Sequence, residues 1–198
     1  MKPAMIIIDM LKDAFKRKDH PSTQEYLNIV PKIKRLLGEA RTLDIPIIYA
    51  CDSFLENDFI FKGKQSFSIR GTEGAEVIDE LKPERQEEIL LKRRFSAFFK
   101  TDLDLTLRLL GVDTAVVSGI NTHVCVLATA MDAICNDFNA IVLEDCSASY
   151  QREVHRGSIE VLKESGLSPL LRVMTSEAFL EEIGKNAVMM KKENHGAQ

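Results

Sequence analysis

The stretch TAVVSGINTHVCVLATAMDAIC, residues 114–135, decides the fold. It begins with a short apolar run over 114–118 that contains two valines and a threonine, which is typical of a buried strand. From Thr122 to Cys135 the chain is rich in alanine, leucine and methionine, which favours a helix. A strand that passes within a few residues into a helix predicts one unit of an α/β protein, in which the helix packs on the sheet.

Segments of the same two kinds alternate on both sides of this unit. Five other short apolar runs predict strands, at residues 4–8, 45–50, 88–91, 140–143 and 170–173. Helical spacing of apolar residues predicts helices over 26–43, 101–110, 154–164 and 176–183. Because the strands are too uniformly apolar to leave one face in water, they predict a parallel sheet with helices on both sides.

The composition is that of a single folded domain. The chain has 198 residues, of which 45% are hydrophobic and 28% are charged, and no repeat or Gly/Ser-rich linker divides it. We therefore expect one domain over residues 1–184. A polar tail over residues 185–198 is expected to be mobile or used in assembly.

Charge and cysteine usage exclude several classes of function. The formal net charge is −4 with the two signs interspersed, so no basic stripe indicates nucleic-acid binding. The apolar run at residues 4–8 is too short for a signal peptide or a membrane span, so we expect a cytoplasmic protein without membrane contact. The four cysteines are then expected to be reduced, and neither they nor the four histidines have the spacing of a zinc site.

Three polar residues follow predicted strands. Asp9 follows the first, Lys92 follows the third, and Cys125 lies just past the fourth, in the first turn of its helix. Open α/β sheets bind ligands at the carboxyl ends of their strands, so we expect these residues to meet at one edge. The segment 52–73 has little regular pattern, and a loop of that length is usually functional, often a lid over a pocket.

The three residues suit the chemistry of a cysteine hydrolase. Cys125 is the expected nucleophile, and a lysine and a helix N-terminus beside it would lower the pKa of its thiol. Asp9 would take the thiol proton and later return it to a departing amine, while Lys92 stabilises both negative charges. Residue types alone leave other interpretations open: a packed core cysteine, an aspartate that binds a metal or caps a helix, and a surface lysine.

Several segments resemble the isochorismatase-like hydrolases. Residues 92–103, KRRFSAFFKTDL, look like that family's K-x-x-x-S-A-F-x-x-T-x-L signature. Residues 119–133, GINTHVCVLATAMDA, resemble its G-x-x-T-x-x-C-V-x-x-T-A-x-D-A motif. Residues 9–15, DMLKDAF, are similar to its D-M-Q-x-x-F opening, and the stretch from Glu144 to His155 resembles a late motif that ends in histidine. The segments occur in the family's order, and the similarity covers about residues 4–180.

This resemblance implies a three-layer α/β/α sandwich around a mostly parallel, six-stranded, Rossmann-like sheet. It implies a catalytic triad of Cys125, Asp9 and Lys92 that needs no cofactor. It also implies a cis peptide bond between Ile120 and Asn121, which would turn the backbone amides of Asn121 and Cys125 toward the oxyanion formed at the substrate carbonyl. Homo-oligomers are common in the family, so a homo-oligomer is expected.

One part of the family pattern is missing. Its nicotinamidases bind a metal ion through an aspartate after the second strand and two histidines. Asp52 corresponds to the aspartate, but Phe54 and Phe67 stand at the histidine positions. Phenylalanine cannot bind a metal, so we expect no metal ion and disfavour nicotinamide as the substrate. Phe15, Phe54 and Phe95 are expected to line a substrate pocket with Asp52, although Asp52 could instead cap the loop.

Together these features predict an amidase whose partner is a small-molecule amide. Cys125 would attack a small amide, carbamoyl or ureido compound, and water would then release the acyl group. Two alternatives stay open. One is a vinyl-ether hydrolase of the isochorismatase type, although such enzymes often lack the cysteine. The other is a non-catalytic relative in which Cys125 is merely packed.

Overall fold

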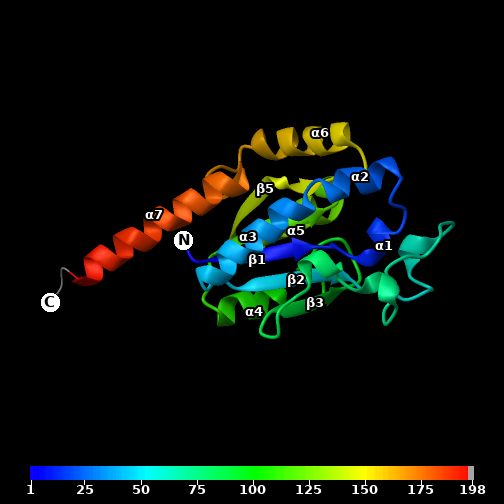
Figure 1. Ribbon diagram of the computed structural model, residues 1–198, viewed down its shortest axis with the longest axis horizontal. Helices are drawn as coiled ribbons and strands as arrows, with labels where there is room; N and C mark the ends of the chain where they lie inside the picture. The colour runs from blue at the N-terminus through cyan, green and yellow to red at the C-terminus, as the bar shows by residue number, and fades with distance from the viewer. Residues whose placement is uncertain (196–198) are drawn as a thin grey trace.

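The computed structural model of the protein describes residues 1–195, in which strands and helices alternate along the chain (Figure 1). The strands are β1 (Pro3–Ile8), β2 (Ile47–Asp52), β3 (Glu88–Lys92), β4 (Thr114–Ile120), β5 (Asn139–Ala148) and β6 (Leu171–Met174). The α-helices are α1 (Lys12–Phe15), α2 (Pro21–Leu27), α3 (Val30–Thr42), α4 (Leu103–Leu109), α5 (Leu127–Cys135), α6 (Arg152–Lys163) and α7 (Ser176–His195). Short turns of 3-10 helix occur at η1 (Phe59–Phe61), η2 (Glu73–Ala75) and η3 (Asp79–Leu81), and a π-helical turn forms η4 (Thr122–Val126).

The six strands form one parallel sheet in the order β3-β2-β1-β4-β5-β6. The chain thus begins in the middle of the sheet, builds one side with β2 and β3, and returns to the other side of β1 with β4. This reversal creates a switch point between β1 and β4, which is where open α/β sheets bind ligands. Every predicted strand is present, and the predicted fold class is confirmed.

Helices cover both faces of the sheet, and each face has its own apolar core (Figure 1). Met5 and Ile7 of β1 belong to the core that includes α3 and α7. Ala4, Ile6 and Ile8 belong to the core that includes α4, α5 and α6. No side chain from residue 4 to residue 8 is more than 1% exposed. Burial on both faces explains why the strand sequences are apolar throughout rather than alternating.

Two helices differ from their predicted extents. The predicted helix over 26–43 is divided between α2 and α3, because Pro31 lacks an N–H to donate and fits only the first turn of a helix, here that of α3. The last helix runs to His195, so the boundary expected after residue 184 falls inside α7. Alanine, methionine, lysine and glutamate are strong helix formers and dominate the segment after Gly184. Residues 196–198 of the expected tail lie outside the described residues.

The carboxyl ends of β1, β2, β3 and β4 lie at one edge of the sheet. These strands end at Ile8, Asp52, Lys92 and Ile120. Polar residues at or just after these ends are therefore brought together although they are distant in the sequence. Among residues 1–195, no helix has both the length and the apolar character needed to cross a membrane.

Candidate active site

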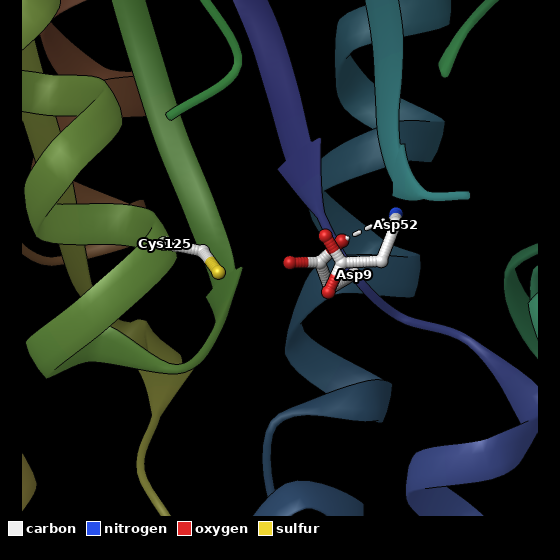
Figure 2. Close-up of side chains that lie close together, drawn as sticks. All are labelled: Asp9, Asp52 and Cys125. Atoms are coloured by element: carbon white, nitrogen blue, oxygen red, sulfur yellow. Dashed lines mark hydrogen bonds between the residues drawn. The ribbon is translucent and has the colours of Figure 1, made fainter. Parts of the chain in front are cut away.

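Asp9, Lys92 and Cys125 meet at the carboxyl edge of the sheet. Asp9 directly follows β1, Lys92 is the last residue of β3, and Cys125 lies in the π-helical turn η4 that precedes α5. Asp52, the last residue of β2, joins them. The sulfur of Cys125 and one carboxylate oxygen from each aspartate lie within 4.8 Å of one another, and Figure 2 shows the sulfur facing both carboxylates. The structure therefore brings the predicted residues together and adds a second carboxylate.

Lys92 is completely buried and binds both aspartates. Its Nζ donates to Oδ2 of Asp9 at 2.8 Å and to Oδ1 of Asp52 at 2.5 Å. The backbone N–H of Asp52 donates to Oδ1 of Asp9 at 2.8 Å, so both oxygens of Asp9 are held. Asp52 is therefore an ion-pair partner of Lys92 at the end of a strand, and the alternative that it caps the loop is wrong. A charge buried this deeply requires such a partner.

The residues around Asp52 do not fit a metal ion. Asp9, Asp52 and Cys125 are close enough to share one, but the ammonium of Lys92 already bonds both carboxylates. The two positions that the resemblance to nicotinamidases assigns to histidines hold Phe54 and Phe67. Their rings pack edge to face with each other and with the ring of a third phenylalanine, at centroid distances of 5.2 to 5.5 Å. An apolar wall thus stands where nitrogen ligands would be needed.

The predicted lowering of the thiol pKa is wrong. Burial raises the pKa of Cys125 well above its usual value, and the negative charge of Asp9 raises it further. The ammonium of Lys92 lowers this pKa, but the charge of Asp52 acts against that effect. Burial, together with two aspartates facing one ammonium, therefore keeps Cys125 a neutral thiol in the resting state.

The same cluster shifts the pKa of the groups that surround the thiol. Burial and the charge of Asp9 raise the pKa of Asp52 to about 7, although Lys92 acts in the opposite direction. Burial by itself lowers the pKa of Lys92, but the negative charge of Asp9, together with that of Asp52, outweighs it and raises the pKa overall. Lys92 is therefore a permanent cation at neutral pH. Because Lys92 keeps its proton, Asp9 is the group that can accept a proton from the sulfur and return it.

The backbone brings the ends of β1 and β4 unusually close. Gly119 has a φ of +113°, and a Cβ placed on it would lie 2.1 Å from the carbonyl oxygen of Ile8. Only glycine permits this approach, which sets the distance between Asp9 and the turn that carries Cys125. Asp9 itself has a φ of +52°. The peptide bond between Ile120 and Asn121 is cis, as the resemblance implied.

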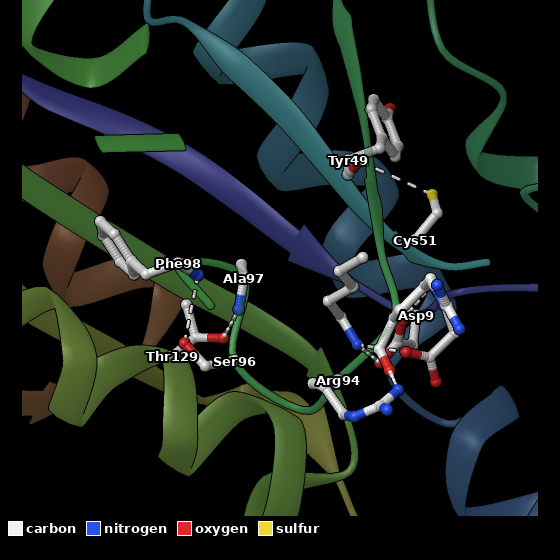
Figure 3. A network of polar contacts seen from close by, with 11 residues as sticks. Asp9, Tyr49, Cys51, Arg94, Ser96, Ala97, Phe98 and Thr129 are labelled. Carbon is white, nitrogen blue, oxygen red and sulfur yellow. Dashed lines mark hydrogen bonds and ion pairs between the residues drawn. The ribbon is translucent and has the colours of Figure 1, made fainter. Parts of the chain in front are cut away.

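A hydrogen bond also joins the segment after β3 to helix α5, and a second one lies within that segment (Figure 3). The N–H of Ala97 donates to Oγ1 of Thr129 on α5 at 3.0 Å. The N–H of Phe98 donates to Oγ of Ser96 at 3.1 Å. Two of the sequence motifs therefore act as a scaffold: they tie the strand that ends in the lysine to the helix that follows the cysteine.

A cavity of about 420 Å³ opens onto the cluster. Three of the residues expected in a substrate pocket line it: Asp52, Phe54 and Phe95. The fourth, Phe15, was wrongly placed there. Its ring packs edge to face on Tyr26 with centroids 6.2 Å apart, and Ala14 lines the wall instead. A shift of one residue along the short helix α1 is enough to turn the aromatic side chain away from the cavity.

Several residues that line the cavity were not found from the sequence. They include Arg17, Thr23, Tyr26 and Ile60. Asn121 was expected to act only through its backbone, but its side chain also lines the cavity and accepts a hydrogen bond from the hydroxyl of Tyr26 at 2.7 Å. No strand end or motif marks Arg17, Thr23, Tyr26 or Ile60, because tertiary packing alone brings them to the cavity.

The chain is similar to several known proteins. The chain resembles a probable inactive nicotinamidase of Arabidopsis thaliana, at 29% identity over 88% of this chain and 95% of the relative. A solved isochorismatase-like hydrolase from Alkaliphilus metalliredigens superposes with a TM-score of 0.83, at 34% identity over 92% of this chain and 99% of that chain. The N-carbamoylsarcosine amidase from Thermoplasma acidophilum has a TM-score of 0.78, at 30% identity over 89% and 97% of the two chains. Residues 3–178 match the Isochorismatase domain, and the chain belongs to the isochorismatase family.

Proposed function

We propose that the protein is an amidase that hydrolyses a C–N bond of a small amide, carbamoyl or ureido compound through a covalent acyl-enzyme on Cys125. The observation that carries this proposal is the position of Asp9, which bonds Lys92 and lies beside the sulfur at the floor of a cavity. The similarity to an N-carbamoylsarcosine amidase supports cleavage of this type of bond.

The first half of the proposed reaction forms the acyl-enzyme. The sulfur of Cys125 attacks the carbonyl carbon while its proton passes to Asp9. Because the pKa of the free thiol is raised, this proton transfer accompanies the attack instead of preceding it. The carbonyl oxygen becomes an oxyanion, for which the backbone N–H groups of Asn121 and Cys125 are the proposed donors. As the C–N bond breaks, Asp9 returns the proton to the departing nitrogen.

The second half releases the acid. Asp9, again a carboxylate, takes a proton from water while the water oxygen attacks the thioester carbon. The C–S bond then breaks, the carboxylic or carbamic acid leaves, and the proton on Asp9 returns to the sulfur. Lys92 keeps its charge throughout, and its ammonium stabilises Asp9 in the form that accepts protons.

A non-catalytic role is the main rival, because one similar protein is described as a probable inactive nicotinamidase. The placement of Cys125 favours catalysis, since the residue lines the cavity next to a carboxylate instead of packing only against apolar side chains. The phenylalanines at the histidine positions disfavour nicotinamide without disfavouring other amides, because the cysteine, aspartate and lysine do not depend on those positions.

A substrate panel tests the proposal. The protein is incubated with primary amides, carbamoyl and ureido compounds, and isochorismate. Released ammonia is measured for the nitrogen compounds, and released pyruvate is measured for isochorismate. We expect ammonia from at least one class, and an acyl adduct on Cys125 in the mass spectrum of the acid-quenched protein. Cys125→Ala should lower turnover by about 10³-fold or more. Cys135→Ser, at an exposed thiol on α5, is the matched control and should retain activity. Turnover of isochorismate alone would indicate the vinyl-ether reaction, and no turnover of any compound would indicate a non-catalytic relative.

A further inference from the structure

Tyr26 and Asn121 form a polar pair on the wall of the cavity. Tyr26 comes from α2 and Asn121 from the turn between β4 and η4, and both line the cavity that contains Cys125. The phenolic hydroxyl of Tyr26 donates to Oδ1 of Asn121 at 2.7 Å. Tyr26 is only 7% exposed, and its ring is held against Phe15. The pair is therefore a built feature and not a chance contact of two mobile surface groups.

The hydrogen bond leaves the nitrogen of Asn121 available to a ligand. Burial raises the pKa of Tyr26 to about 12, so its hydroxyl stays protonated and acts as the donor at neutral pH. With Oδ1 occupied by Tyr26, the carboxamide cannot rotate freely, and Nδ2 has no hydrogen-bond partner among residues 1–185. An asparagine offers two donors at this nitrogen.

Two hydroxyls on the nearby wall are already engaged in hydrogen bonds. The hydroxyl of Ser22 bonds Nδ1 of His20 at 2.6 Å, and the hydroxyl of Thr23 donates to the carbonyl of Ala14 at 3.4 Å. Another part of the wall is apolar, since the side chains of Phe54, Ile60 and Phe67 have no hydrogen-bonding atoms. A flat apolar group can thus lie on one wall while a polar atom of the same molecule faces Asn121.

We propose that the side chain of Asn121, oriented by Tyr26, selects amides whose flat acyl group carries a hydrogen-bond acceptor within two bonds of the scissile carbonyl carbon. The distance limit follows from the double role of Asn121. Its backbone N–H is a proposed donor to the carbonyl oxygen itself, so its own side chain reaches the neighbouring part of the acyl group. Asn121 is then a binding residue and Tyr26 a positioning residue. This inference rests on the proposed amidase function.

Pyridine carboxamides provide matched probes. Benzamide, picolinamide, nicotinamide and isonicotinamide have the same shape and differ only in the presence and position of one ring nitrogen. Picolinamide places this acceptor two bonds from the carbonyl carbon. We expect kcat/KM for picolinamide to exceed that for benzamide by about fivefold to tenfold, the effect of one hydrogen bond. In Asn121→Leu, which keeps the size but removes the donor, this ratio should fall to about one. Tyr26→Phe should lower the ratio only in part, because Asn121 keeps its donor but loses the hydroxyl that orients it.

The ratio of kcat/KM for picolinamide to that for benzamide distinguishes a loss of recognition from a loss of folding. A variant that merely folds poorly lowers turnover of both amides and leaves the ratio unchanged. Tyr49→Phe is the control, because it removes another buried tyrosine hydroxyl from a residue that does not line the cavity, and the ratio should stay at the wild-type value. A wild-type ratio near one, a preference for the other two isomers, or a ratio that survives Asn121→Leu would overturn the inference.

Binding measurements can test this inference separately from the proposed amidase function. Titration calorimetry of picolinamide and benzamide with Cys125→Ala measures recognition without turnover. If no amide is hydrolysed but picolinamide still binds about fivefold tighter and loses that advantage in the Asn121→Leu background, the amidase proposal fails and the subsite stands. If amides are hydrolysed but the two ligands bind equally well, the subsite fails and the amidase proposal stands.

Discussion

The inner and outer sides of the cavity are built in different ways. The inner side consists of strand ends, where Asp9, Asp52 and Lys92 are buried and bonded to one another. The outer side consists of the irregular segment 53–73 and the segment around α1 and α2, which supply aromatic rings and Arg17. The inner groups could hardly move without breaking several hydrogen bonds at once, whereas the outer groups come from short turns and loops.

The outer side is held by a few separate contacts. Asp58 accepts a hydrogen bond from the N–H of Leu55 at 2.9 Å and pairs with Arg93. The N–H of Ser68 donates to Asp13 at 2.6 Å, which joins the irregular segment to α1. Each of these contacts can change without disturbing the strand ends. The difference suggests that the inner side determines the reaction and the outer side determines the substrate, and substitutions on each side can test this division.

The largest effect is expected for Lys92→Met, which leaves two buried carboxylates without their cation. Methionine keeps an unbranched apolar stem like that of lysine, so the change in unfolding free energy should come mainly from the loss of the positive charge. Breaking a buried ion pair from one side typically costs about 3–5 kcal/mol of unfolding free energy, which urea unfolding measures. Lys163→Met is the control: it breaks the partly exposed ion pair with Glu144, 2.7 Å long, and should cost about 1 kcal/mol or less. Equal losses in the two variants would contradict the special role of the inner side.

The second prediction compares two glycines with positive φ. Gly119→Ala places a methyl group against the carbonyl oxygen of Ile8 and must displace the strand end that carries Asp9. A displacement of this kind is expected to lower kcat/KM for the best amide about 10²-fold. Gly63, in the irregular segment, has a φ of +74° and no neighbouring atom within 4 Å of an added Cβ. Gly63→Ala should cost about 1 kcal/mol of stability through backbone strain and leave turnover unchanged. Similar kinetic losses in both variants would remove the distinction between the two sides.

The same division explains what could be predicted from the sequence. Strand positions followed from uniform apolar runs such as residues 4–8, and the edge where the triad meets followed from the strand order that such folds allow. Asp9, Lys92 and Cys125 could be found because each occupies a fixed place relative to a strand end. Gly119 carried a readable signal as well, since a glycine inside a strand often marks a close backbone approach.

The remainder depends on packing that no short-range pattern encodes. The pairing of Tyr26 with Asn121 joins residues 95 positions apart in the sequence, and neither residue type indicates the other. The thiol pKa was predicted in the wrong direction because the sequence placed Lys92 near Cys125 without showing how deeply the thiol is buried, and burial is the largest cause that raises its pKa. The negative charges of Asp9 and Asp52 add to this effect. The depth of burial and the charge balance of such a cluster both depend on its tertiary packing, so the position of one lysine does not determine the direction of the shift.

The third prediction concerns the pH dependence of thiol reactivity. A raised pKa means that little Cys125 is thiolate at pH 7, so alkylation by iodoacetamide should be slow there. Below the pKa the rate should rise about tenfold per pH unit, without a plateau up to pH 9. Asp52→Asn removes one of the charges that raise this pKa, so at pH 8 it should speed labelling severalfold. Peptide mass spectrometry in a Cys135→Ser background measures the rate at Cys125. Fast labelling at pH 7, or slower labelling in Asp52→Asn, would contradict the charge balance seen at the inner side.

The smallest effect is expected on the outer side, for Arg17→Gln. Arg17 lines the cavity from the segment after α1, is exposed, and forms no ion pair with an acidic residue among residues 1–185. Its charge should attract an anionic substrate, but weakly, because exposed charges are screened by water and salt. We expect the ratio of kcat/KM for succinamate to that for neutral butyramide to fall about twofold to fivefold in the variant. Raising the ionic strength from about 0.05 M to 0.5 M should lower the wild-type ratio in the same direction and leave the variant ratio nearly constant. A loss of about 10²-fold for both amides would instead mean that Arg17 takes part in the reaction, because a rim charge that only attracts substrate has no reason to affect a neutral amide.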